Sequence, residues 1–138
     1  MTVSLKRIII IGGGVGGLSA AIGLHRLGLN VSVYERLPLI GDVGAGLTLW
    51  ANAVKAFRKL GIDGEMLGGK RIQGSVISTQ NGSILYRSSS QALEKKLGAP
   101  TIAVHRADLH RLLMSKLPEG MVQTRRFVGF EQNTKGVT

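Results

Sequence analysis

Apolar residues near the amino terminus form an unbroken run that ends in a cluster of glycines. Residues 8–11 are consecutive isoleucines, a pattern typical of a strand buried on both faces of a parallel sheet. Beyond the glycines, apolar residues recur at helical spacing and predict a helix over about residues 16–27. Alternation over residues 31–35 predicts a second strand. The pattern therefore predicts a strand–helix–strand unit whose first strand covers residues 5–11.

The rest of the chain continues as an α/β pattern. Asn81-Gly82 separates two β-rich segments and is a strong signal for a hairpin with a type I′ turn. Asn52 is a good residue for a helix N-cap, and Gly61 suits the position just past that helix. The expected elements are a helix over 52–60, hairpin strands over 72–80 and 83–87, helices over 91–97 and 107–117, a third parallel strand over 121–128, and the start of a β-meander over 131–138.

The glycines after the first strand are spaced as Gly12-x-Gly14-x-x-Gly17, and an acid, Glu35, ends the second strand. Gly12 permits the tight turn, Gly14 lets the backbone approach a pyrophosphate, and Gly17 lets the helix pack closely on the strand. The N–H groups of the first helical turn, at Val15 and Gly16 among others, are expected to face the phosphates. The carboxylate of Glu35 is placed to accept hydrogen bonds from ribose hydroxyls. Together these features predict a binding site for a dinucleotide.

Small residues after the glycine motif extend the match. Ala21 and Gly28 let the helix and the following turn lie close to the sheet. With them the sequence resembles the FAD-binding flavoproteins, whose N-terminal fingerprint carries small residues at these places.

Two further segments resemble the class A flavin monooxygenases, the p-hydroxybenzoate hydroxylase-like hydroxylases, with the urate-hydroxylase-like branch as the nearest. Residues 44–53 read GAGLTLWANA, although Ala51 stands where the family usually has proline, and Val104-His105-Arg106 precedes a helix. The resemblance implies an α/β fold: a Rossmann-like FAD-binding βαβ sheet with an added β-hairpin, C-terminally incomplete relative to the family. Residues 1–138 are then one FAD/NAD(P)-binding domain, the N-terminal portion of a longer family chain.

The resemblance also implies cofactors and roles. In the family NAD(P)H reduces bound FAD, and one oxygen atom of O2 is transferred to an aromatic or similarly conjugated substrate. Arg106 matches an arginine that approaches the diphosphate and ribityl side of FAD. Arg36 is expected at the adenosine end, Thr48 near the flavin, and Val128 where strand backbone meets the adenine. No residue here is assigned as a catalytic acid or base.

The composition mainly excludes certain kinds of site and function. The absence of cysteine excludes a disulfide, a thiol nucleophile and cysteine-ligated metal in these residues, and the histidines show no metal-binding spacing. The net charge of +10 is scattered and aromatic residues are few, so nucleic-acid binding is not expected. No apolar stretch is long enough for a signal peptide or a membrane span, and we expect a cytoplasmic protein. Exposed apolar surface on an incomplete unit would favour self-association.

Three functions fit this sequence. The first is the FAD-binding part of a monooxygenase, which alone is expected to be inactive as a hydroxylase. The second is a non-catalytic dinucleotide-binding module. The third is an NAD-dependent dehydrogenase, which would share the glycines and Glu35 but has no reason to carry Asn52 or Arg106 in this order.

Overall fold

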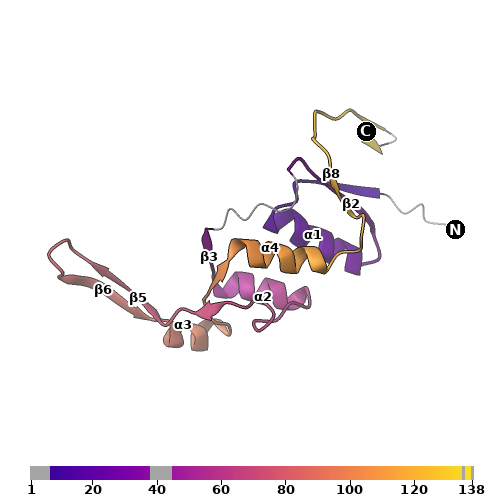
Figure 1. The fold of residues 1–138 in the computed structure, drawn as a ribbon. Helices are drawn as coiled ribbons and strands as arrows, with labels where there is room; N and C mark the ends of the chain where they lie inside the picture. The colour runs from indigo at the N-terminus through magenta and orange to yellow at the C-terminus, as the bar shows by residue number, and fades with distance from the viewer. Residues whose placement is uncertain (1–6, 38–44, 135, 138) are drawn as a thin grey trace. The chain divides into compact units, whose positions relative to one another are not determined.

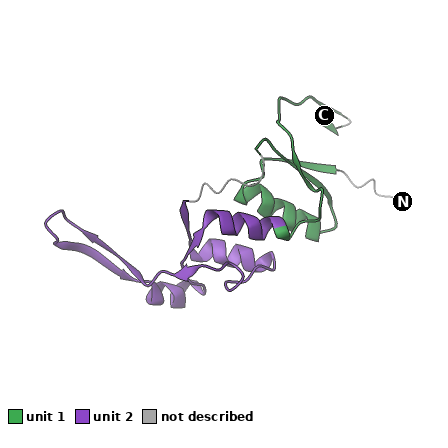
Figure 2. Ribbon diagram, in the orientation of Figure 1, with its two compact units in different colours: residues 1–41, 115–138 green, residues 42–114 purple. Residues whose placement is uncertain are grey.

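The structure is a computed structural model that describes residues 7–37, 45–134 and 136–137. These residues form two compact units, one of residues 1–41 and 115–138 and the other of residues 42–114 (Figure 2). We call them unit 1 and unit 2 and describe each by itself. The expectation that residues 1–138 form one domain stays a prediction.

Unit 1 is built around a parallel sheet (Figure 1). Strand β1 (Arg7–Ile11) leads through the glycine turn into helix α1 (Val15–Arg26), which returns the chain to strand β2 (Asn30–Glu35). Strand β8 (Val122–Thr124) joins the other side of β2, and the spatial order is β1-β2-β8 with both pairs parallel. The predicted βαβ unit and third parallel strand are confirmed. The part of the first strand predicted over residues 5 and 6 lies outside the described residues.

The core of unit 1 lies between this sheet and α1. Ala21 of α1 and Val31 and Val33 of β2 are buried together there, with Ile8 and Ile10 packed against them. The side chains on the opposite face of β1 are different: Ile9 is 39% and Ile11 49% exposed. The prediction that both faces of β1 are buried was therefore wrong for the described residues, because α1 covers only one face of the sheet.

The end of unit 1 also differs from expectation. The third strand was predicted over residues 121–128, but β8 ends at Thr124, because only three residues pair with β2. The chain then continues without regular structure to two short strands, β9 (Gln132–Asn133) and β10 (Gly136–Val137), which pair antiparallel. Val128 thus lies outside any strand and is 93% exposed.

Unit 2 contains a small antiparallel sheet and helices. Its strands are β3 (Gly46–Leu49), β7 (Ile102–His105) and the short β4 (Lys70–Arg71), with β7 in the middle. Helix α2 (Ala51–Lys59) follows β3, α3 (Ser90–Leu97) precedes β7, and α4 (Arg106–Ser115) follows it directly. The predicted helices are confirmed, but Asn52 is not the N-cap of α2. Trp50 holds that position without a side-chain cap bond, because the helix begins at Ala51.

The predicted hairpin is present as β5 (Gly74–Ser78) and β6 (Ile84–Ser89), which pair antiparallel. Its turn is not type I′, because that turn requires positive φ at both central residues and among the described residues only glycines have positive φ. Instead the N–H of Gly82 donates to the Thr79 carbonyl at 3.0 Å, and Gly82 itself carries the left-handed φ of 87°. The loop is longer than predicted, and a register shift follows Ile77.

Candidate functional site

The glycine turn at the carboxyl end of β1 is the centre of the candidate site. Gly12 has a φ of 103°, a backbone conformation that residues other than glycine rarely adopt. Its N–H donates to the Tyr34 carbonyl of β2 at 2.8 Å, which fastens the turn to the neighbouring strand. The turn therefore depends on glycine at this position for its conformation.

Gly17 is required for a second reason. A Cβ built on Gly17 would lie 2.0 Å from the carbonyl oxygen of Gly12 and 3.4 Å from Ile10. Backbone occupies this space, so no side-chain movement can relieve the clash. The close helix–strand packing predicted from the glycine spacing is thus present in the structure.

Gly14 presents the opposite environment. A Cβ added there meets no atom within 4 Å, and the residue has an ordinary extended backbone with φ of −74° and ψ of 179°. Neither fold nor backbone conformation demands glycine at this position. The open space beside Gly14 is what the predicted approach of a ligand to the backbone requires.

Helix α1 begins beside this open space. Gly14 is its N-cap and makes no side-chain cap bond, and the first turn contains no acidic residue. The first intrahelical bond runs from the N–H of Leu18 to the Gly14 carbonyl at 2.9 Å, so the N–H groups of residues 15–17 precede it. These N–H groups and the positive end of the helix dipole suit a diphosphate.

Glu35 ends β2 and reaches back to the glycine turn. Its Oε2 accepts a hydrogen bond from the N–H of Gly13 at 2.7 Å, and its Oε1 accepts one from the N–H of Leu37 at 3.0 Å. These two backbone bonds lower the pKa of the Glu35 carboxyl, and the positive charge of Arg36 acts in the same direction. The carboxylate is therefore held ionised at the rim of the turn, where it has further lone pairs for a ribose hydroxyl.

One residue near Glu35 was not predicted from the sequence. The N–H of Arg125 donates to the Glu35 carbonyl at 2.8 Å, and its guanidinium lies over the Tyr34 ring, 5.9 Å from the ring centre. Through these two contacts Arg125 supports the end of β2 that carries the Glu35 carboxylate. In the sequence it is only one of a pair of arginines, and nothing in its spacing indicates this contact.

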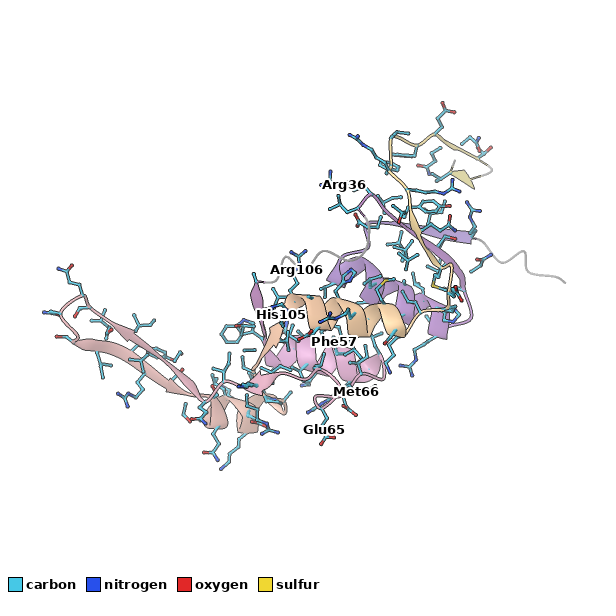
Figure 3. The ribbon with its side chains drawn as sticks, viewed as in Figure 1. Arg36, Phe57, Glu65, Met66, His105 and Arg106 are labelled. Atoms are coloured by element: carbon cyan, nitrogen blue, oxygen red, sulfur yellow. The ribbon has the colours of Figure 1, made fainter. Side chains whose placement is uncertain are left out.

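The predicted site residues fall into two groups. The glycine turn, Glu35 and Arg36 lie together in unit 1, as does Val128 further along the chain. Thr48 and Arg106 belong to unit 2. Figure 3 labels Arg36 of the first group and Arg106 of the second. Within that unit the N–H of Arg106 donates to the Ala45 carbonyl at 3.3 Å, at the edge where β3 begins and β7 ends. The roles of these residues stay predictions, and Gly44 of the motif lies outside the described residues.

Three further observations concern other possible sites and the kind of chain. A hollow of about 370 Å³ is lined by His25, Asn30 and Glu119 among others. It lies at the amino ends of β2 and β8, whereas open α/β sheets bind ligands at the carboxyl ends of their strands. Within the described ranges no three histidine or acidic side chains are grouped as they would be around a metal ion. None of the helices in the described part of the chain is long and apolar enough to cross a membrane.

A parallel βαβ unit with this glycine turn, this helix start and this acid defines the class of dinucleotide-binding α/β folds. The comparison with family models is consistent with that class, and residues 7–82 match the pyridine nucleotide-disulphide oxidoreductase model. Because the match covers more than half of its residues, the chain belongs to this family. The chain contains no cysteine, so the shared feature is the nucleotide-binding fold rather than a disulphide centre.

Individual relatives are hydroxylases, and one of them is FAD-dependent by name. The chain is 36% identical to the 3-hydroxybenzoate 6-hydroxylase of Polaromonas naphthalenivorans and covers 34% of it. It is 34% identical to the FAD-dependent urate hydroxylase of Mycolicibacterium vanbaalenii, again covering 34% of that protein. Among solved structures, Klebsiella pneumoniae HpxO complexed with FAD and uric acid matches 96% of this chain and 34% of its own, with a TM-score of 0.83 and 29% identity. The chain thus spans about a third of the relatives it matches.

Proposed function

We propose that this chain binds FAD as the N-terminal part of an NAD(P)H- and oxygen-dependent flavoprotein monooxygenase. The substrate would be an aromatic or conjugated small molecule, the class that the names of the relatives indicate. The observation that carries the proposal is the ionised carboxylate of Glu35 bound to the N–H of Gly13, beside the unobstructed start of α1. This arrangement supports a ribose acceptor and a set of phosphate donors at the carboxyl ends of β1 and β2.

The residues present fit FAD at its adenosine and diphosphate end. Glu35 would accept hydrogen bonds from the ribose hydroxyls, and the N–H groups of residues 15–17 would donate to the diphosphate. The open space at Gly14 would let the diphosphate come close to the backbone. Arg36 adds positive charge beside Glu35, where it would contact the adenosine end.

At the flavin end the proposal rests on family resemblance. Arg106 would approach the diphosphate and ribityl side, Thr48 the flavin, and the exposed backbone at Val128 the adenine. FAD, when bound, supplies the redox and oxygen chemistry, and the protein supplies position and the exclusion of water. NAD(P)H as electron donor and a cytoplasmic location are part of the same proposal.

The second candidate is a non-catalytic FAD-binding module, and the coverage of about a third of the relatives favours it for the chain taken alone. The two candidates share the cofactor site but differ in activity. The FAD-containing relative at 29% identity favours both over an NAD-dependent dehydrogenase.

An activity assay separates these candidates. We expect the 138-residue chain alone to retain FAD weakly, to oxidise little NAD(P)H, and to release mostly hydrogen peroxide in any turnover. The reason is that the chain has a well-formed set of binding groups only for the adenosine and diphosphate end of FAD, so the flavin ring would be exposed to water. Robust NAD(P)H consumption stimulated by an aromatic substrate, together with a hydroxylated product, would contradict this. It would mean that another copy of the chain completes the site.

A further inference from the structure

The loop at the tip of the β5–β6 hairpin contains a reactive pair of residues. Residues 79–83 join β5 to β6 at the end of the hairpin that is far from α3 (Figure 1). Asn81 is the one asparagine of the sequence that a glycine follows, because the others precede valine, alanine and threonine. The side-chain amide of an asparagine can be attacked by the backbone nitrogen of the next residue, and a glycine hinders this attack least because it has no Cβ.

The loop leaves both reacting groups accessible to water. Residues 80–83 are exposed, and Thr79 is half-buried. The N–H of Gly82 donates to the Thr79 carbonyl at 3.0 Å, and this bond has to open before the nitrogen can react. A two-stranded hairpin has marginal stability in water, so a bond at its tip opens readily.

The hydroxyl of Thr79 contacts the amide that would react. It donates a hydrogen bond to the side-chain oxygen Oδ1 of Asn81. The hydroxyl oxygen also accepts a bond from the N–H of Ser83 at 3.1 Å, and the N–H of Thr79 donates to the Ser83 carbonyl at 2.9 Å. Because these two bonds tie residue 79 to residue 83, the turn itself holds the hydroxyl in place.

This position of the hydroxyl favours attack on the amide. When the Gly82 nitrogen attacks Cγ of Asn81, negative charge develops on Oδ1. A hydrogen-bond donor that already points at this oxygen stabilises the charge, as the donors of an oxyanion hole do in acyl transfer. The turn therefore supplies both the nitrogen nucleophile and the donor.

We propose that Asn81 is a site of spontaneous deamidation that the Thr79 hydroxyl promotes. The Gly82 nitrogen gives its proton to solvent and forms a bond with Cγ of Asn81. The side-chain nitrogen takes up a proton and leaves as ammonia, and a cyclic succinimide remains. Water then opens the ring at either carbonyl carbon. The products are aspartate, or isoaspartate, in which the main chain runs through the former side chain.

The modification changes the charge and the geometry of the hairpin tip. Both products place a carboxylate in a segment, residues 72–93, that has Arg87 as its single charged side chain. Isoaspartate also adds a main-chain atom between residues 81 and 82, so the bond from Gly82 to Thr79 cannot keep its geometry. The proposal is independent of FAD binding, and its test uses no cofactor.

Peptide mapping of the whole 138-residue chain tests the proposal. Cleavage by trypsin after lysine and arginine yields a peptide of residues 72–87, in which Asn81 is the single asparagine, and a peptide of residues 127–135 with Asn133. Asn133 is the internal control, because it is also exposed and lies at the end of β9, but threonine follows it. During incubation of the native chain at neutral pH, mass spectrometry should show NH2 replaced by OH at residue 81, together with isoaspartate. The peptide with Asn133 should stay unchanged, and a sample digested at time zero gives the background.

Two variants at residue 79 test the role of the hydroxyl. Thr79→Val removes the hydroxyl at nearly constant shape, whereas the matched control Thr79→Ser retains it. Thr79→Val should deamidate about 2- to 10-fold more slowly than wild type, the scale of one net hydrogen bond, and Thr79→Ser should stay close to wild type. Loss of the bond from Ser83 would loosen the turn and by itself speed the reaction, so a slower rate reports the contact with Oδ1.

Incubation in urea completes the experiment. With the hairpin unfolded, the wild type and both variants should deamidate at the same rate, because no turn then holds the hydroxyl at Asn81. Asn81 that stays intact as long as Asn133 in the native chain would overturn the proposal. So would native Thr79→Val reacting as fast as wild type, or a difference between the two that persists in urea.

Discussion

The glycine turn of unit 1 and the hairpin of unit 2 are both exposed, but they expose different chemistry. Around the glycine turn the surface presents the N–H groups at the start of α1 and the carboxylate of Glu35, and a Cβ on Gly14 would meet no atom within 4 Å. On the hairpin the surface presents Leu85, Tyr86 and their apolar neighbours. The first surface suits an anionic ligand, and the second suits packing against other apolar protein groups. Exposure alone therefore does not identify a binding site; the kind of group that is exposed does.

The same substitution at two glycines gives the sharpest contrast within unit 1. Gly17→Val should cost more than about 3 kcal/mol of unfolding free energy, above the usual range for overpacking, because the new Cβ would meet the Gly12 carbonyl oxygen. Thermal and urea unfolding of the chain without cofactor measure this. Unchanged unfolding of Gly17→Val would show that the close packing of helix on strand is wrong.

Gly14→Val should leave the same unfolding curves nearly unchanged, because a Cβ there meets nothing within 4 Å. Its effect should appear in FAD binding, which we expect to weaken by more than about 3 kcal/mol, or over 100-fold. The branched side chain would fill the space into which the diphosphate must come. Isothermal titration calorimetry compares the variant with wild type, and normal FAD affinity would refute the assignment of the phosphate site.

The two glycines also show what the sequence predicts well. Strand, glycine turn, helix, second strand and terminal acid are set by local backbone requirements, and the structure contains each of them. Long-range features were predicted less well. These features depend on which distant segments meet, and apolar periodicity does not encode that. They are the exposure of Ile9, the early end of β8 at Thr124 and the contact of Arg125 with Tyr34. The turn before Gly82 was mispredicted because Asn81-Gly82 is compatible with more than one loop length.

Glu35→Gln tests charge rather than shape at the same site. The variant should weaken FAD binding by about 1–3 kcal/mol, the scale of losing a charged hydrogen-bond acceptor. It also weakens the bond from the Gly13 N–H, so a small loss of stability without cofactor should accompany it. An FAD affinity equal to wild type would show that the carboxylate does not contact the ribose.

The pKa of Glu35 predicts the smallest effect. Because it is lowered in the folded chain, the carboxylate stays ionised below the ordinary glutamate pKa of about 4.3. Its contribution to stability is complete above that value and is lost as the pH falls through the lowered pKa. FAD affinity of the wild type should therefore decline only below about pH 4, the region of that ordinary value. Glu35→Gln should lack this step in a pH titration, and a step at neutral pH would contradict the lowered pKa.

The central claim is that unit 1 recognises the adenosine diphosphate half of FAD. Titration of the wild-type chain with FAD and with FMN, followed by flavin fluorescence, tests it most directly. FMN has the same flavin ring and a phosphate but lacks the adenosine half that Glu35 and the α1 start are positioned to bind. We predict that FAD binds clearly more tightly than FMN, and also more tightly than NAD in a competition titration. Equal affinities for FAD and FMN would contradict the account.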